Sequence, residues 1–139
     1  MTEIDFYVLA DAESRQRDLL ACRVAEKAFE LGHRMFIHTP GDDHAQHLDA
    51  LLWIFRNGAF LPHALASDDP GAPIVIGSGE EPADTRHLLV NLAGTVPAFF
   101  SRFERVAEIV NEDPAVREAG RERFRFYRDR GYSLRTHKL

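Results

Sequence analysis

Arginines and aromatic rings are concentrated in one stretch near the end of the chain, "RERFRFYRDRGY", residues 121–132. On a helical wheel of about 100° per residue, four arginines and one phenylalanine share an arc of about 100°. These side chains are Arg117, Arg121, Phe124, Arg125 and Arg128. Guanidinium groups pair with carboxylates, and a ring packs against an apolar side chain. The pattern therefore predicts a pocket for a carboxylate and an apolar group together, in preference to a solvated face with ordinary ion pairs to Glu118 and Glu122.

The net charge of the 139 residues is −5, but it is unevenly distributed. Residues 1–116 carry 9 Lys/Arg and 19 Asp/Glu, whereas residues 117–139 carry 8 and 3. An acidic body repels a phosphate backbone, which argues against nucleic acid as the main partner. The basic end suits a small anionic partner such as an acidic peptide. Direct contact with single-stranded DNA stays open, because arginines and aromatic rings also stack on bases.

Apolar residues are dense in "LLWIF" (51–55) and in "AFLPHALA" (59–66). Five consecutive apolar residues point around the whole circumference of a helix, so one buried face cannot hold them all. Some of this surface must face the adjacent loop or another protein. Core packing and a partner-facing role for Trp53 and Phe60 are both compatible with the sequence.

Two weaker patterns suggest a metal or a nucleotide. His44 and His47 in "GDDHAQH" are spaced to ligate one metal, and Gly77 and Gly79 in "IVIGSGEEP" follow an expected strand. Capping of a helix start explains the first pattern better, and Pro82 with its acidic neighbours opposes a phosphate site in the second. We expect no catalytic residue, metal or cofactor, and a small α/β enzyme using these positions is the alternative hypothesis.

The elements that must position these residues alternate along a single domain, residues 1–139. Strands are expected at 4–10, 33–39, 73–77, 87–92 and 105–110, and helices at 13–31, 40–55 and 113–130. A long loop is expected at 56–73, one or two helical turns at 96–103, and a polar tail at 132–139. The alternation predicts a three-layer α/β sandwich with a largely parallel central sheet.

The lone Cys22 excludes an intramolecular disulfide and is expected to be a plain buried residue. The N-terminus lacks a basic region ahead of its apolar run, and no apolar stretch approaches the roughly 18 residues of a membrane span. These features predict a soluble, cytoplasmic protein.

The chain resembles the chi subunit family of bacterial DNA polymerase III holoenzyme. The resemblance extends from "DFYVLA" through "LLW", "FLPH" and "PIVI" to "FERVAEIV" and "RERFRFYRDRGYSL", which is essentially the whole chain. It implies a mononucleotide-binding-like (Rossmann-like) α/β fold without catalytic activity. It also implies an adaptor in DNA replication that connects single-stranded DNA-binding protein to the psi subunit, and through it to the clamp loader.

The resemblance assigns expected roles to particular residues. Arg117, Arg121 and Arg125, with Arg128 nearby, would hold carboxylates of the acidic, Phe-terminated tail of single-stranded DNA-binding protein. Phe124 would pack on the terminal apolar side chain, over a floor that includes Val110. The psi-facing positions would be Trp53, Phe60, Pro62 and His63; in some relatives this face also serves an accessory helicase. The family often has Tyr and Lys where this chain has Phe124 and Arg125, which leaves the character of the pocket intact but changes individual hydrogen bonds.

Overall fold

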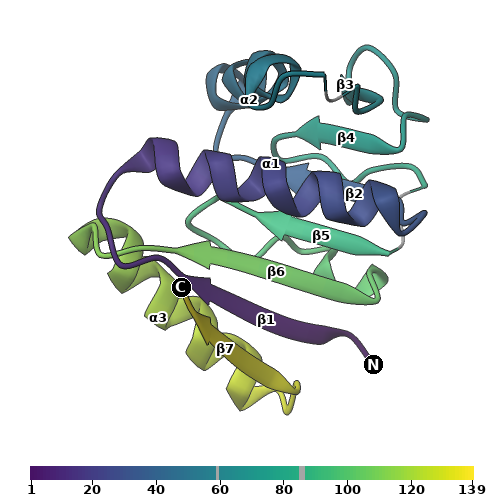
Figure 1. Ribbon diagram of the computed structural model, residues 1–139. Coiled ribbons are helices and arrows are strands. Elements are labelled where there is room, and N and C mark those ends of the chain that lie inside the picture. Colours follow the sequence, from purple (N-terminus) through teal and green to yellow (C-terminus); the bar gives the residue numbers. More distant parts are fainter. Residues whose placement is uncertain (59, 85–86) are drawn as a thin grey trace.

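A computed structural model describes residues 1–58, 60–84 and 87–139. Strands and helices alternate along most of the chain (Figure 1). In chain order the elements are β1 (Glu3–Val8), α1 (Ser14–Glu30), β2 (Met35–His38), α2 (Asp42–Ile54), β3 (His63–Leu65), β4 (Ile74–Gly77), β5 (Leu88–Asn91), the 3₁₀ turn η1 (Phe100–Arg102), β6 (Arg105–Val110), α3 (Pro114–Asp129) and β7 (Leu134–Lys138).

The seven strands of the described residues form one sheet in the order β3-β4-β2-β5-β6-β1-β7. Every neighbouring pair is parallel. β1 lies between β6 and the edge strand β7, with Phe6 opposite Glu108 on one side and Thr136 on the other. Because all strands run the same way, their carboxyl ends meet at one edge, where ligands of such folds usually bind.

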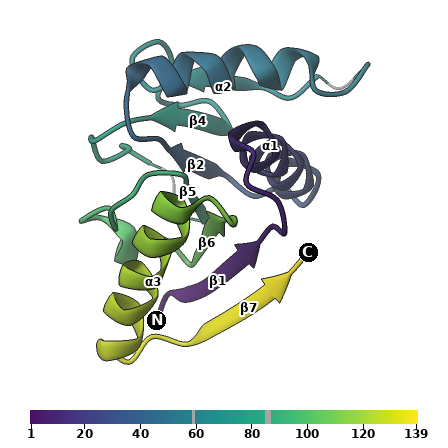
Figure 2. The same cartoon turned by 90° about the vertical axis from the view of Figure 1, so that its left-hand side faces the viewer.

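Alternate strand residues face opposite layers. Met35, Ile37 and Ile109 pack with α1 and α2 on one face, and Phe6, Phe36 and other residues pack with α3 on the other face. Figure 2 shows α1 and α3 on opposite sides of the sheet. Both faces are therefore covered, and the predicted three-layer α/β sandwich is confirmed, with a sheet that is wholly rather than largely parallel.

Two expectations were wrong at the edges of the sheet. The loop predicted at 56–73, of which residue 59 lies outside the described residues, contains the three-residue strand β3, which pairs with β4. The polar tail predicted at 132–139 contains β7, which pairs with β1 along five positions. An edge strand needs only one paired neighbour and one packed face, so it can form without a strong apolar pattern of its own.

The last helix begins and ends where the sequence predicts. Asp113 accepts a hydrogen bond from Val116 N–H at 3.2 Å, and Pro114 occupies the first turn. Gly131 follows the helix with a φ of 80°, a conformation that favours glycine. These two ends define the extent of α3, and therefore which of its side chains can turn toward β1 and β6.

Candidate functional site: a basic groove beside the last helix

A groove of about 180 Å³ lies between α3 and the strands β1, β6 and β7. We call it the tail groove, and it is lined by Phe6, Val8, Val110, Asn111, Glu112, Arg117, Gly120, Arg121, Phe124 and Thr136. Its base is apolar, because the side chains of Val110 and Phe6 form it; they are 7% and 3% exposed. Phe124 meets Phe6 edge to face, with ring centroids 5.3 Å apart. Arg117 and Arg121 stand at its margin, so apolar and cationic groups share one depression.

Close packing of α3 on β6 forms the inner wall of the tail groove. A Cβ at position 120 would lie 2.7 Å from Val110 Cγ1, closer than any real side chain allows. Glycine therefore permits an approach that alanine would prevent. Gly120 thus brings the helix close to the sheet.

A buried polar network holds α3 in register. The fully buried Glu108 of β6 accepts hydrogen bonds from Arg123 Nε at 2.8 Å, Tyr127 Oη at 2.7 Å and Asn91 Nδ2 at 3.1 Å. Burial raises the pKa of Tyr127, and the Glu108 charge raises it further, so the hydroxyl stays protonated and donates. Two of the three donors come from α3, which ties the helix to one position on the sheet.

The arginines of the helix are exposed and loosely paired. Arg117 contacts Glu112 at 3.1 Å and Arg121 contacts Glu118 at 3.8 Å; Arg125 pairs with Glu122, and Arg128 with its neighbour Asp129. All four arginine side chains are about half exposed, at 48–58%. Exposed pairs of this kind contribute about 0–1 kcal/mol. An incoming carboxylate can therefore replace such a partner at little cost.

The structure brings only part of the predicted set together. Val110, Arg117, Arg121 and Phe124 line the tail groove, whereas Arg125 and Arg128 do not. Arg125 lies at the far edge of the arc, about 80° from Arg117 on the wheel. Arg128 points between Arg117 and Arg121 but lies about 10 Å further along the helix than Arg121.

Residues of β1 and β7 complete the tail groove, and the sequence analysis missed them. Phe6 and Val8 alternate along β1, and that spacing signals a shared face. Thr136 carries no such signal, because only the pairing of β7 with β1 brings it to the groove.

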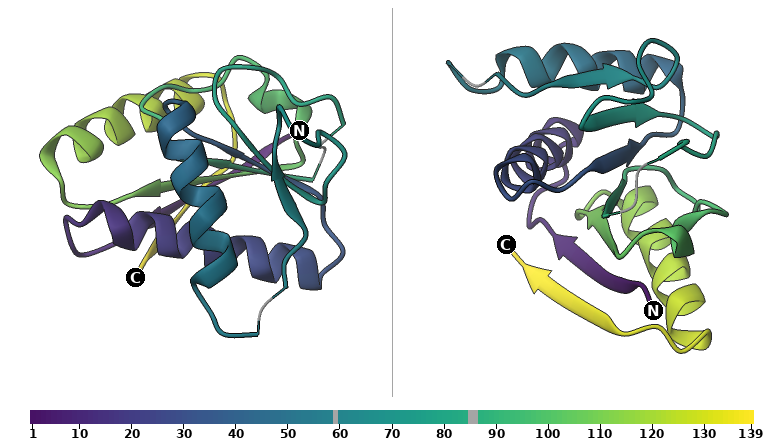
Figure 3. Two further views of the ribbon diagram at one scale, coloured as in Figure 1. Left: turned by 90° about the horizontal axis from the view of Figure 1, so that it is seen from above. Right: turned by 90° about the vertical axis from the view of Figure 1, so that its right-hand side faces the viewer.

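A second surface consists of the exposed apolar side chains at the end of α2 and in the loop that follows. Trp53 is 57% exposed, Ile54 73% and Phe60 82%. Pro62 is also exposed. Figure 3 shows this end of α2 leading into a loop that projects from the body. The expectation that part of the "LLWIF" surface escapes the core is confirmed.

His63 lies beneath this surface rather than on it. Its side chain is wholly buried and stands between the Leu61 carbonyl at 2.6 Å and the Asp49 carbonyl at 3.0 Å. The Trp53 ring covers it, with ring centroids 4.6 Å apart. His63 thus supports Trp53 and orders the loop after α2.

The two surfaces lie at opposite ends of the sheet. The second surface adjoins β3 and the tail groove adjoins β7, and these strands are the two edges (Figure 1). Six spacings of about 4.8 Å separate the edges, or roughly 29 Å before twist is considered. The two surfaces are therefore well separated on the protein.

Comparison with known proteins decides the family. The family described as DNA polymerase III chi subunit, HolC, matches residues 1–135. The chain belongs to the chi subunit family of DNA polymerase III. This confirms the resemblance found in the sequence and makes the protein an accessory subunit of a replicative polymerase, with replisome proteins as partners.

Relatives across three organisms agree with this family. A "DNA polymerase III subunit chi" from Pseudomonas aeruginosa is 47% identical over 139 residues, covering 100% of this chain and 98% of the relative. The subunit chi of Escherichia coli is 30% identical over 120 residues, covering 84% and 82% of the two chains. That of Haemophilus influenzae is 27% identical over 137 residues, covering 96% and 95%.

Among solved structures, the crystal structure of T4 UvsW matches with a TM-score of 0.69 at 11% identity. The match covers 99% of this chain but 42% of UvsW. At that identity the likeness concerns the α/β fold alone.

The histidines of the alternative hypothesis belong to an ion-pair cluster. His44 Nε2 lies 2.8 Å from Asp18 Oδ1 and His47 Nε2 lies 3.6 Å from Asp18 Oδ2, which joins the start of α2 to α1. Across the described ranges, no group of three or more His, Cys, Asp or Glu side chains is arranged to hold a metal ion. The geometry favours a structural role for this pair.

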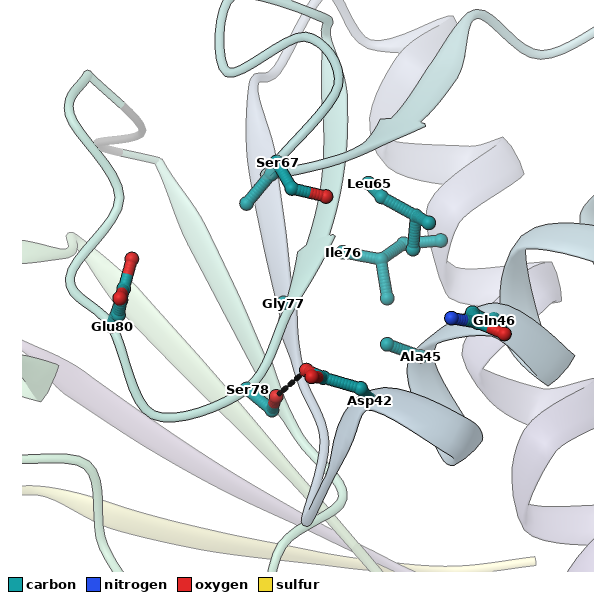
Figure 4. Close-up of a pocket in the computed structure, with 10 residues that line it drawn as sticks. Asp42, Ala45, Gln46, Leu65, Ser67, Ile76, Gly77, Ser78 and Glu80 are labelled. Atoms are coloured by element: carbon teal, nitrogen blue, oxygen red, sulfur yellow. Dashed lines mark hydrogen bonds between the residues drawn. The ribbon is translucent and has the colours of Figure 1, made fainter.

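The turn after β4 likewise lacks the features of a phosphate site. Figure 4 shows the pocket beside Gly77, where Ser78 donates to Asp42 at 2.8 Å and Glu80 also lines the wall. Gly79 has a φ of 82°, and its N–H donates to His38 Nε2 at 3.3 Å. Two carboxylates at the pocket repel phosphate, and the turn's N–H is already occupied.

Cys22 is fully buried in α1, and burial raises the pKa of its thiol to about 12. A thiol that keeps its proton is a poor nucleophile. The expectation of a plain buried cysteine is confirmed.

No helix in the part of the chain that the structure describes is long and apolar enough to cross a membrane.

Proposed function

We propose that this chi-family protein is a non-catalytic adaptor that captures the acidic C-terminal tail of single-stranded DNA-binding protein in the tail groove. The same molecule binds the psi subunit, or another replisome or helicase protein, through the second surface. The observation that carries the proposal is the tail groove, which places Arg117 and Arg121 beside an apolar base formed around Phe124.

The groove suits a peptide that ends in an aromatic residue. A terminal Phe provides a ring for the apolar base and a main-chain carboxylate at the same residue. Arg121 and Arg117 supply guanidinium groups for that carboxylate and for acidic side chains upstream. Arg125 and Arg128, which lie outside the groove, would meet only upstream acidic residues.

The competing ion pairs fit a reversible capture. Glu112 and Glu118 neutralise Arg117 and Arg121 while the groove is empty. A tail carboxylate exchanges one exposed pair for another, so most of the binding energy must come from burial of the terminal ring. Binding in the micromolar range, about −8 kcal/mol, is the expected outcome.

The second surface suits a protein partner. Trp53 and Phe60 are the kinds of side chain that anchor protein interfaces, and Pro62 stands beside them. His63 contributes by holding the Trp53 ring from below. Separation from the tail groove allows one molecule to connect two partners.

The test is a competition experiment. A fluorescent acidic peptide ending in Ile-Pro-Phe is bound to the protein, and either unlabelled peptide or a single-stranded oligonucleotide is added. Displacement by peptide but not by oligonucleotide at equal ionic strength supports the proposal. Displacement by the oligonucleotide would instead make the basic helix a direct DNA contact, and loss of the terminal Phe must abolish binding if the groove is the site.

A further inference from the structure

A second cavity, of about 170 Å³, lies on the other side of α3 from the tail groove. Its walls come from the turn after β5, from α1 and from the first turns of α3. Gly94, Ala115 and Ala119 contribute little or no side chain to these walls. Two arginines line it, Arg17 of α1 and Arg123 of α3.

Both arginines are buried, which is unusual for a residue that almost always reaches water. Arg123 is 3% exposed and Arg17 is 8% exposed. Burial lowers the pKa of Arg17, and the neighbouring Arg123 charge lowers it further. Two guanidinium charges thus face the same small space, an arrangement that an anion would stabilise.

Their hydrogen-bonding capacity is only partly used. Arg17 donates to backbone carbonyls, to Ile109 at 3.0 and 3.2 Å and to Leu92 at 3.2 Å, and its Nη1 has no partner among the described residues. Arg123 donates to Glu108 and, through Nη1, to the Gly94 carbonyl at 3.2 Å. Its Nη2 is buried without any partner in the described part of the chain. A buried donor without an acceptor is costly, so Nη2 of Arg123 calls for an acceptor.

The acidic side chains near the cavity already have partners, and one of them, Glu108, is the partner of Arg123. Glu108 accepts from Arg123, Tyr127 and Asn91, Asp18 pairs with His44, and Asp113 caps α3. Within the ranges that the structure describes, Arg17 forms no ion pair with any carboxylate. Glu108 thus balances the charge of Arg123, whereas Arg17 feels only the electrostatic influence of Asp18, Glu108 and Asp113, without a direct ion pair.

The topology places this cavity where open parallel sheets bind ligands. The neighbouring strands β1 and β6 lead into helices on opposite faces, α1 and α3 (Figure 2). Such a change of direction usually creates a crevice outside the carboxyl ends of the strands. Arg17, in the first turns of α1, bonds to the carbonyls of Leu92 and Ile109 and so crosses the ends of β5 and β6. Ala115 and Val116 bring the N-terminal turn of α3 to the same place, and its dipole favours negative charge.

We propose that this cavity binds one small oxyanion, a phosphate or carboxylate group, between Arg17 and Arg123. The bound group would accept hydrogen bonds from the free N–H groups of both side chains. This site is separate from the tail groove and does not depend on the function proposed there.

The experiment is an NMR titration of the full chain with inorganic phosphate, against sodium chloride at matched ionic strength. Saturable shifts of the Arg17 and Arg123 Nε–H signals and of the Gly94 amide are expected with phosphate only. A second titration, with acetate, distinguishes a carboxylate ligand from a phosphate ligand. Shifts with acetate assign the site to a carboxylate of an acidic partner, and shifts confined to phosphate assign it to a phosphate group.

The decisive variant is Gly94→Asp, with Gly94→Asn as its uncharged match. A Cβ at position 94 would meet no heavy atom within 4 Å, so both variants are expected to fold. The aspartate carboxylate supplies an internal competitor and should weaken phosphate binding at least tenfold, whereas Gly94→Asn and the distant Ala98→Asp should change it less than threefold. Equal binding by Gly94→Asp and wild type, or shifts that chloride reproduces, would overturn the proposal. Binding of the tail peptide should be the same in all of these variants.

Discussion

Gly120 of α3 sits so close to Val110 of β6 that a Cβ added at position 120 would approach Val110 Cγ1 to 2.7 Å. This contact sets the distance between the helix and the sheet. Both residues also line the tail groove. The stability of the fold and the shape of the candidate binding site therefore depend on the same pair.

A Gly120→Ala substitution is expected to destabilise the protein. The overpacking penalty of about 1–3 kcal/mol exceeds the roughly 1 kcal/mol that alanine gains over glycine inside a helix. Urea denaturation measures the change. In a Val110→Ala background, where the obstructing methyl group is absent, the same substitution should become neutral or stabilising. A stabilising effect in the wild-type background would show that the contact does not limit the approach of the helix.

Breaking the Glu108–Arg123 pair is expected to destabilise the fold strongly. Arg123→Met leaves the Glu108 carboxylate, and Glu108→Gln leaves the Arg123 guanidinium, without a charged partner in a fully buried setting. Removal of one member of a buried pair costs about 3–5 kcal/mol. The double variant should recover part of the loss, as a double-mutant cycle in urea can determine. Simple additivity of the two losses would mean that the pair does not act as a unit.

Cys22 gives the protein a pH dependence at the alkaline end. The thiol pKa is about 12 in the folded protein, above its ordinary value of about 8.5 in an unfolded chain. The folded state therefore binds the extra proton, so this contribution is complete below about pH 8.5 and is lost as the pH rises toward 12. Between pH 9 and pH 10.5 the free energy of unfolding should fall by about 1–2 kcal/mol more in wild type than in Cys22→Ala.

The second surface should affect partner binding without affecting the fold. Phe60→Ala removes an 82% exposed side chain, so the free energy of unfolding should change by less than about 0.5 kcal/mol. Binding of a psi subunit should weaken at least tenfold, while binding of the acidic peptide should remain at the wild-type level. Pull-down of the psi subunit and calorimetry with the acidic peptide, on the same preparation, test these two predictions. Weakened peptide binding in Phe60→Ala would contradict two separate surfaces.

The sequence predicted the central elements because their patterns are strong. Leu20, Ala21 and Ala25 recur at helical spacing within α1. Asp113 and Pro114 are residue types that favour a helix start, as at α3. The edge strands β3 and β7 carried weak patterns of their own. They form because β4 and β1 offer them backbone groups that would otherwise be unpaired. A local sequence pattern contains no information on such pairing between distant segments.

The sequence predicted the candidate site only in outline, because the site also depends on contacts between elements. A helical wheel grouped the arginines by direction but could not distinguish Arg121, which lines the tail groove, from Arg128, which does not. The sequence pattern did not single out Arg123, although it is buried against Glu108. That pairing depends on strand β6 lying under α3, so it became visible only in three dimensions.

Calorimetric titration with the Phe-terminated acidic peptide, using Arg121→Ala and Arg128→Ala as matched variants, tests the tail groove most directly. Both arginine side chains are 58% exposed on the same helix, so the two variants lose the same charge from equally exposed positions. The account predicts micromolar binding by the wild type, at least tenfold weaker binding by Arg121→Ala, and less than threefold change in Arg128→Ala. Equal losses in the two variants would mean that general charge rather than the groove attracts the peptide, and absence of wild-type binding would refute tail capture by this protein.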